Sequence, residues 1–468
     1  MAARVEAAPI PVGRMRFRTT IVLIVLLLGL GAYVYWGEIP QAQQEAKKKT
    51  LVDFKPDDAT GVSLAYADRT IVLRKTGDTW HITKPRDLPA DATAAKNLVN
   101  AIAQCEVKKE IKEPVADLQQ YGLDRPLVTV TVKLKDRELP AFAVGKNTPV
   151  GFSTYVQRKG DKRILLTSSA FRSGMDKQVK DLRDKTIVTF ADNDVRTVEL
   201  RGDGKHVKLV HKDDSWTIAQ PGPYRADTST IRSFLSTLRS MRAVDFPDDS
   251  PADLSPYGLD NPRLTLTLYL GKNNAEKRLL LGKETDDKKI YVQTTGQPAV
   301  YTVHDWVFRD LNKDVADFRD KTVLTFDRDK VTAVALQRQD GSSVKLVRDD
   351  HNHWHVEGAE GKPVETTITQ YLTDLHELKG YEIAADHPTD LTAFGLDQPL
   401  LRLTTYGAGD KVVGTVLLGT RQAETKKEYT AMAAGGPTVF LVRDYVFTRL
   451  DKHPQDFVET PTPTAGAS

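Results

Sequence analysis

The chain has 468 residues, of which 40% are hydrophobic and 28% are charged, and its formal net charge is +3. The first twenty residues hold four arginines and one glutamate, so the rest of the chain sums to zero. Binding to a polyanion usually requires a basic excess gathered on one surface. We therefore expect no nucleic-acid partner. A single cysteine, Cys105, excludes an intrachain disulfide.

An uncharged apolar stretch occupies residues 20–36. Its 17 residues are close to the shortest helix that can span a bilayer core. Tyr33, Tyr35 and Trp36 would form an aromatic belt at the membrane interface. The stretch predicts a transmembrane helix. A cleaved signal peptide is the alternative, although its apolar region usually has only about 7–15 residues.

Flanking charges predict the orientation of this segment. Arginines at positions 14, 16 and 18 precede it directly, whereas the lysine run 47–49 begins about ten residues after it. The positive-inside rule gives most weight to close flanks. We expect residues 1–19 to be cytoplasmic and 37–49 to form a linker. The protein would then be a single-pass membrane protein, with its bulk outside the cytoplasm.

The remaining chain repeats itself three times. One signature recurs with spacings of 136 residues (257 minus 121) and 137 residues (394 minus 257). These spacings exceed the roughly 20–50 residues of solenoid modules. We expect three domain-sized units at 50–185, 186–321 and 322–458, followed by a disordered tail at 459–468. The signature residues are Tyr121, Gly122, Leu123, Asp124, Pro126; Tyr257, Gly258, Leu259, Asp260, Pro262; and Phe394, Gly395, Leu396, Asp397, Pro399.

Each unit opens with short segments in which apolar and polar residues alternate, such as 61–67 and 70–75. This period of two predicts antiparallel hairpins. Trp80, Trp216 and Trp354 hold one equivalent position, which favours a half-buried site on a sheet.

A helix is predicted after these hairpins. In the second unit Asp227 precedes a stripe formed by Ile231, Leu235 and Leu238, which would bury one helix face. Cys105 stands where the second unit has Met241, so we expect a buried thiol. More strands and a second helix follow. The predicted fold class is α+β: an N-terminal transmembrane helix followed by three tandem, mainly antiparallel α+β repeats.

The signature has a structural explanation that needs no chemistry. Asp117 can cap one helical turn, and Gly122 can adopt the left-handed conformation that ends it. Pro126 favours an extended residue before it and so starts a strand. We interpret the signature as structural. The alternative is that Asp124 and its two counterparts bind a ligand.

Motifs for catalysis are not found. His351, His353 and His355 alternate as metal ligands on a strand could, but the first two align with turn residues of the other units. Gly145-Lys146 and its counterpart at 282–283 lack the upstream glycine of a phosphate loop. We predict no catalytic, cofactor-binding or metal-ligating residue. Distant carboxylates could still form an active site, so an enzyme stays open.

The Tyr/Phe-Gly-Leu-Asp-x-Pro signature, the Leu-Gly-Lys or Leu-Gly-Thr element and the N-terminal apolar segment resemble the bacterial membrane protein family defined by a domain of unknown function, DUF4340. The resemblance covers nearly all of residues 50–458. This family has no established catalytic residues to carry over. Its members often occur beside gliding-type ABC export systems, so the resemblance implies an accessory role at such a transporter.

These observations predict a membrane-anchored, extracytoplasmic, non-catalytic scaffold or binding protein of an envelope or ABC-type export complex. Repetition of a domain multiplies weak contacts, which benefits binding more than a single active site. Two alternatives stay open: an envelope-polymer hydrolase and a glycan-binding module. The hydrolase would carry carboxylates of perturbed pKa in one unit.

Overall fold

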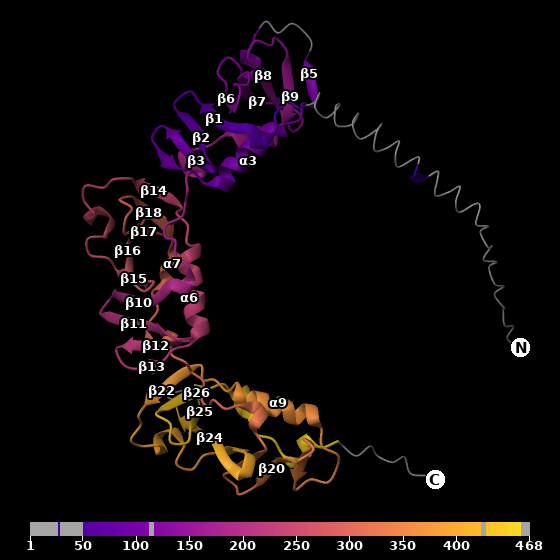
Figure 1. The fold of residues 1–468 in the computed structure, drawn as a ribbon, viewed down its shortest axis with the longest axis vertical. Coiled ribbons are helices and arrows are strands. Elements are labelled where there is room, and N and C mark those ends of the chain that lie inside the picture. The colour runs from indigo at the N-terminus through magenta and orange to yellow at the C-terminus, as the bar shows by residue number, and fades with distance from the viewer. Residues whose placement is uncertain (1–26, 29–49, 112–116, 423–426, 460–468) are drawn as a thin grey trace, which may run out of the picture. The chain divides into compact units, whose positions relative to one another are not determined.

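The computed structural model describes residues 27–28, 50–111, 117–422 and 427–459 (Figure 1). Its strands form three antiparallel sheets of nine, nine and eight strands. The chain divides into two compact units, Met1–Thr186 and Ile187–Ser468. The first unit contains the first sheet, and the second unit contains the other two.

The first repeat is a sheet with the strand order β4-β3-β2-β1-β6-β7-β8-β9-β5. Two meanders, β1–β4 and β6–β9, meet where β1 pairs with β6 at Val62 and Val132. Its strands are β1 (Ala59–Ala65), β2 (Thr70–Thr76), β3 (Thr79–Lys84), β4 (Leu88–Pro89), β5 (Lys109–Ile111), β6 (Val128–Leu134), β7 (Phe142–Asn147), β8 (Ser153–Arg158) and β9 (Ile164–Ser168), and its helices are α3 (Ala92–Ala103), α4 (Ser169–Met175) and α5 (Val179–Leu182).

The second repeat has the same topology, β13-β12-β11-β10-β15-β16-β17-β18-β14. Its strands are β10 (Val195–Gly202), β11 (Lys205–Lys212), β12 (Ser215–Gln220), β13 (Tyr224–Arg225), β14 (Asp245–Asp248), β15 (Leu264–Leu270), β16 (Ala275–Glu284), β17 (Lys289–Thr294) and β18 (Val300–His304), and its helices are α6 (Thr228–Ser240), α7 (Asp305–Leu311) and α8 (Val315–Phe318).

The third repeat follows the same order with one edge strand fewer, β21-β20-β19-β23-β24-β25-β26-β22. Its strands are β19 (Ala333–Arg338), β20 (Ser343–Arg348), β21 (Trp354–Glu357), β22 (Glu382–Asp386), β23 (Leu401–Gly407), β24 (Lys411–Gln422), β25 (Lys427–Ala433) and β26 (Thr438–Val442), and its helices are α9 (Glu365–His376) and α10 (Asp444–Leu450).

One long helix packs against the sheet of each repeat and forms the core with it. Helix α6 begins at Asp227, whose carboxylate accepts a hydrogen bond from the Thr230 amide at 2.9 Å, as the sequence predicts. Its buried side chains join strand residues such as Val198 and Leu266 in one cluster. Because the helix follows β13 at one edge and precedes β14 at the other, it crosses the face of the sheet.

The predicted α+β class is wrong, because the repeats are sheet-dominated. Within its described residues each repeat has eight or nine strands but a single helix longer than seven residues, namely α3, α6 and α9 with 12, 13 and 12 residues. Strands such as β4 and β13 have two residues each, too few to show an alternating pattern. Sequence patterns therefore understate the strand content.

The predicted transmembrane helix is also not part of the observed fold. Within the described residues no helix is long and apolar enough to cross a membrane. Except for Leu27 and Leu28, the predicted span 20–36 lies outside the described residues. The same holds for the predicted N-terminus 1–19, the linker 37–49 and the tail after Glu459.

Candidate functional site

The signature forms one short 3-10 turn in each repeat: η3 (Gln119–Tyr121), η5 (Ser255–Tyr257) and η7 (Thr392–Phe394). The preceding aspartate accepts a hydrogen bond from the first amide of the turn, at 2.8 Å for Asp117, 2.9 Å for Asp253 and 2.8 Å for Asp390. The glycine after each turn is left-handed, with φ of 63° in all three copies. This conformation favours glycine, since a side chain would crowd the backbone there.

A second repeated glycine lies directly beneath this turn. A Cβ atom on Gly145 of β7 would lie 2.3 Å from the Tyr121 carbonyl oxygen, and one on Gly282 of β16 would lie 2.2 Å from that of Tyr257. Gly419 of β24 has the same relation to the third turn, at 2.3 Å from the Gly395 carbonyl. The Tyr/Phe-Gly-Leu-Asp turn and the glycine of the Leu-Gly-Lys or Leu-Gly-Thr element therefore contact each other through their backbones.

In the first two repeats the turn packs against a neighbouring strand, β8 or β17, through aromatic rings. Tyr121 packs edge-on against Tyr155 at 4.9 Å between ring centroids, and Tyr257 packs similarly against Tyr291 at 5.1 Å. The third repeat has Thr430 in place of the second ring, and its hydroxyl donates to the Phe394 carbonyl at 2.7 Å. Each copy of the turn therefore contacts a neighbouring strand, through ring packing in the first two repeats and through a hydrogen bond in the third.

The aspartates of the signature lie at the surface. Asp124, Asp260 and Asp397 are exposed. In the described part of the chain, no group of three His, Cys, Asp or Glu side chains could hold a metal ion. In the described structure the contacts of the signature turn are contacts within its own repeat.

The capping aspartate and the signature aspartate of the second repeat should differ in their effect on stability. We expect Asp253→Ala to destabilise the second repeat by about 1 kcal/mol, because the turn loses the carboxylate that caps it. Asp260→Ala is the matched control and should stay within about 0.5 kcal/mol, as for ordinary surface substitutions. Chemical denaturation of both variants measures this difference. Equal losses would contradict the structural role of Asp253.

The alternating histidines His351, His353 and His355 do not form a metal site in the described structure. The Asp349 carboxylate accepts hydrogen bonds from the backbone amides of His351 and His353, each at 2.9 Å, and contacts the His355 ring nitrogen Nε2 at 2.9 Å. These bonds, above all the one from His355, lower the pKa of Asp349 to about 2. The group is an organised turn before β21.

The burial of the cysteine and of the three repeated tryptophans can be compared with the sequence predictions. Cys105 is buried as predicted, and its burial raises the thiol pKa to about 12, so the thiol is unreactive at neutral pH. The tryptophans are buried more deeply than predicted: Trp80, Trp216 and Trp354 expose only 8%, 6% and 6% of their surface.

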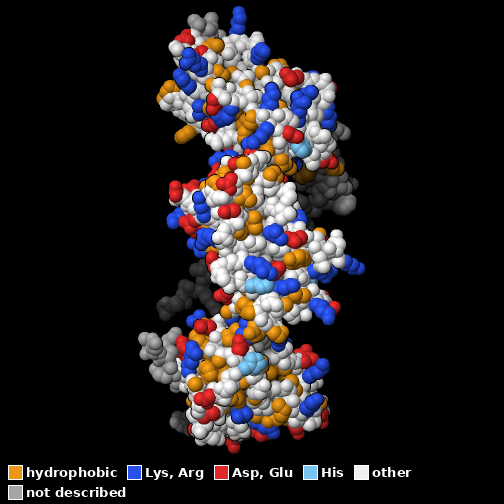
Figure 2. All heavy atoms as spheres, turned by 90° about the vertical axis from the view of Figure 1, so that its left-hand side faces the viewer, with side chains coloured by type: hydrophobic (Ala, Val, Ile, Leu, Met, Phe, Trp, Pro, Cys, Tyr) orange, Lys and Arg blue, Asp and Glu red, His pale blue; other side chains and the backbone are white. Residues whose placement is uncertain are grey.

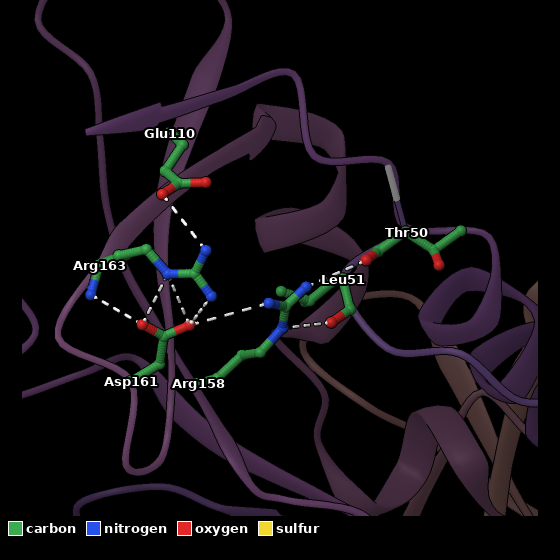
Figure 3. Close-up of polar contacts among 6 residues, drawn as sticks. All are labelled: Thr50, Leu51, Glu110, Arg158, Asp161 and Arg163. Atoms are coloured by element: carbon green, nitrogen blue, oxygen red, sulfur yellow. Dashed lines mark hydrogen bonds and ion pairs between the residues drawn. The ribbon is translucent and has the colours of Figure 1, made fainter. Parts of the chain in front are cut away.

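An ion cluster holds the start of the first repeat (Figure 3). The Arg158 guanidinium on β8 donates to the Leu51 carbonyl at 2.7 Å and lies 3.8 Å from the Asp161 carboxylate. Arg163 pairs with Asp161 at 2.7 Å and with Glu110 at 3.4 Å. The hydrogen bonds from Arg163 lower the pKa of Asp161 to about 2. The first residues of the repeat are thereby tied to its sheet.

The second and third repeats are joined without a linker. The Asp320 amide donates to the Arg225 carbonyl of the second repeat at 2.9 Å. The next residue, Lys321, accepts a hydrogen bond from the Gly380 amide of the third repeat, also at 2.9 Å. Consecutive residues are thus hydrogen-bonded to different repeats, with no unbonded residue between them.

Side chains reinforce this junction. The Arg319 guanidinium binds both carboxylate oxygens of Asp386, with one bond of 2.7 Å, and lies 4.2 Å from the centre of the Tyr224 ring. The Thr438 hydroxyl donates to Asp386 at 2.9 Å. The Arg319 side chain is only 11% exposed, so water screens this pair little. Paired guanidinium and carboxylate groups of this kind add geometric specificity.

A cleft of about 550 Å³ lies at this junction and is lined by both repeats. Tyr224 and Arg225 contribute from the second repeat, and His387, Pro437 and Phe440 contribute from the third. We take this junction cleft as the candidate functional site. Arg319 and Thr438 lower the pKa of the cleft carboxylate, Asp386, so it is an ionised acceptor at neutral pH. This carboxylate can accept hydrogen bonds or pair with a cation in the cleft, but it has no proton to donate at neutral pH.

The lowered pKa of Asp386 predicts how the junction responds to acid. A carboxylate whose pKa is lowered by folding contributes stability above its unfolded pKa of about 3.9, and this contribution is lost as the pH falls through the folded value. Wild type should therefore be more stable than Asp386→Asn at pH 7, and this difference should vanish on acidification below about pH 3.9. Urea unfolding from pH 2.5 to 7 measures it. A pH-independent difference would contradict the ion pair.

The sequence contained a signal for this site that the prediction did not use. Arg-Asp-Lys-Thr occurs at 183–186 and 319–322, where another repeat follows. The last repeat has Val458 and Glu459 in the place of the arginine and aspartate. A motif found at both places where one repeat passes into the next indicates a role in joining repeats.

The fold and the site define a mainly β protein of three homologous repeats, two of them fused around a cleft. The chain belongs to the family described as domain of unknown function (DUF4340), whose model matches residues 80–218, 216–399 and 365–462. The first two matches begin 30 residues after the expected starts of the units (80 minus 50, and 216 minus 186). Each of these two matches therefore begins within one repeat and ends within the following one.

Other comparisons add no functional information. No curated protein matches the chain. Two solved DNA polymerase sliding clamps from Pseudomonas aeruginosa, one with a ligand and one bound to griselimycin, share 8% identity with it. The first alignment covers 84% of this chain and 94% of the clamp at a TM-score of 0.13, and the second covers 86% and 95% at 0.11. Scores this low carry no argument about the fold.

Proposed function

We propose that the chain is a non-catalytic scaffold of the cell envelope, located outside the cytoplasm, which holds a protein partner of an envelope or ABC-type export complex. The junction cleft is the proposed contact site. The observation that carries this proposal is the linker-free junction at Asp320 and Lys321. A fixed junction presents two repeats to a partner in one geometry, which lowers the entropic cost of binding.

The distribution of charge also supports a protein partner. Figure 2 shows acidic and basic side chains interspersed over the visible face. Arg225 pairs with Asp320 at 2.9 Å, and Lys379 lies 3.6 Å from Asp227 across the junction. Transient protein interfaces have a similar mixture of polar rim and apolar contact. In this cleft Tyr224 and Phe440 provide the apolar part.

The hydrolase alternative has less support at this cleft. A general acid requires a carboxyl whose pKa is raised towards neutrality. Asp386 shows the opposite shift, and Asp320, the other carboxylate of the cleft, is paired with Arg225. We therefore favour binding.

A site-specific crosslink tests the proposed contact. A photo-reactive phenylalanine analogue at Pro437, which is exposed in the cleft, should form an adduct with an envelope or transporter protein in intact cells. The same analogue at Gln337, an exposed position on β19, is the control and should not form it. The adduct should disappear in an Asp386→Ala background. The absence of an adduct at Pro437, or equal adducts at both positions, would contradict the proposal.

The expected location has its own test. Alkaline phosphatase fused after residue 459 should be active, because this enzyme requires the oxidising conditions outside the cytoplasm. An inactive phosphatase fusion together with an active cytoplasmic reporter would contradict an extracytoplasmic location.

A further inference from the structure

The first sheet has a hollow on the face opposite helix α3. Val62 and Leu64 of β1 point into the core, with 2% and 0% exposure. Since side chains alternate along a strand, Gly61 and Ser63 face the other side. A cavity of about 420 Å³ lies over these two small residues.

Three cations surround this hollow. Gly61 pairs with Arg74 on β2 and with Lys133 on β6, and directly paired residues share one face of a sheet. These two cations stand two strand spacings apart, about 10 Å, with no side chain between them. Lys84 of β3, which pairs with Val72, also lines the cavity.

The three cations have no partners within the described structure. Arg74, Lys84 and Lys133 are exposed, and none forms a hydrogen bond or ion pair through its side chain with another described residue. Among the lining residues Glu138 is the only acid, so three positive charges and one negative charge leave +2. Hydroxyls of Ser63 and Thr131 add hydrogen-bonding groups at its floor.

The second repeat has a carboxylate at the position equivalent to Ser63. Ser63 pairs with Thr131, and the equivalent pair in the second sheet is Glu199 with Thr267. Glu199 is buried at 9% exposure, and its carboxylate binds the Arg201 guanidinium and the His206 ring, each at 2.6 Å. The second repeat thus supplies its own anion on this face. The first repeat has cations and a cavity instead.

We propose that the hollow at Gly61 and Ser63 is a binding site for a ligand that carries a phosphate group. A phosphate group is negatively charged both when free and in a phosphodiester headgroup, so either form complements the local charge of +2. Arg74 can donate two hydrogen bonds to a phosphate, whereas Lys133 and Lys84 contribute compact charges. The group can belong to free phosphate or to a phospholipid headgroup, and the experiment distinguishes these sources.

Calorimetric titration of the full chain with inorganic phosphate at constant ionic strength tests the site. Wild type should bind saturably, and Arg74→Gln combined with Lys133→Gln should weaken binding at least tenfold. Ser63→Glu, which installs the carboxylate of the second repeat, should weaken it equally. Lys162→Gln, at an exposed position beyond β8, is the matched control and should stay within twofold. Circular dichroism verifies that each variant is folded.

Vesicle sedimentation identifies the source of the phosphate group. If the ligand is a headgroup, the double variant should bind phosphatidylglycerol vesicles at least tenfold more weakly than wild type, with no change on phosphatidylcholine. If the ligand is soluble, only the phosphate titration should respond to the substitutions. Wild-type protein that binds neither probe, or a double variant that binds both as wild type does, would overturn the proposal.

Discussion

Replacing Gly145 by alanine is expected to destabilise the first repeat by about 3 kcal/mol, the upper part of the range for overpacked sites. The added Cβ would lie 2.3 Å from the Tyr121 carbonyl oxygen. That atom is backbone and is held in the 3-10 turn, so it cannot rotate away as a side chain could. Hydrogen exchange of β7 and β8 amides, followed by mass spectrometry, measures the local opening free energy.

Gly174 provides the control for this substitution. It lies in helix α4 of the same repeat, and outside its chain neighbours and the backbone of that helix a Cβ there would meet no atom within 4 Å. Because glycine costs a helix up to about 1 kcal/mol relative to alanine, Gly174→Ala should be neutral or slightly stabilising. If the β7 amides were equally protected from hydrogen exchange in Gly145→Ala and Gly174→Ala, the proposed contact of Gly145 with the Tyr121 carbonyl would be contradicted.

Removing the Asp386 carboxylate should have the second largest effect, a loss of about 2 kcal/mol at the junction. Asp386→Ala leaves the Arg319 guanidinium unpaired at 11% exposure. An unpaired charge at a partly buried site is costly, because neither water nor a counterion solvates it fully. Faster exchange of amides in β13 and β22 should report the loosened junction.

An exposed ion pair of the same repeat is the matched comparison. Lys345 and Glu357 lie 3.0 Å apart, with 44% and 58% exposure. Surface pairs contribute only about 0–1 kcal/mol, so Glu357→Ala should leave β13 and β22 protected. If the β13 and β22 amides exchanged as slowly in Asp386→Ala as in Glu357→Ala, the junction would not depend on the ion pair between Arg319 and Asp386.

The repeat, its hairpins and its main helix could be predicted, because their signals are local and occur three times. Asp227 caps α6, and Ile231 and Leu235 are buried on its inner face. The left-handed glycine of the signature also follows from a local rule, since few other residues adopt positive φ readily. These features depend on neighbouring residues in the chain.

The fold class and the site could not be predicted in this way, because they depend on residues far apart in the sequence. Arg319 and Asp386 are separated by 67 residues, and no spacing rule brings them together. The edge strand β13 has two residues, and only its pairing with β12 reveals it. Similarly, the hollow at Gly61 requires knowledge of which residues flank β1 on both sides.

A distance measurement between the second and third sheets tests the fixed junction most directly. Spin labels at Lys272→Cys, on the turn after β15, and Gln337→Cys, on β19, occupy exposed positions. Cys105 is buried and does not compete for the label. Double electron–electron resonance should give one narrow distance distribution in wild type and a broader one in Asp386→Ala. A broad or multi-peaked distribution in wild type would show that the two repeats move independently, contrary to the linker-free junction.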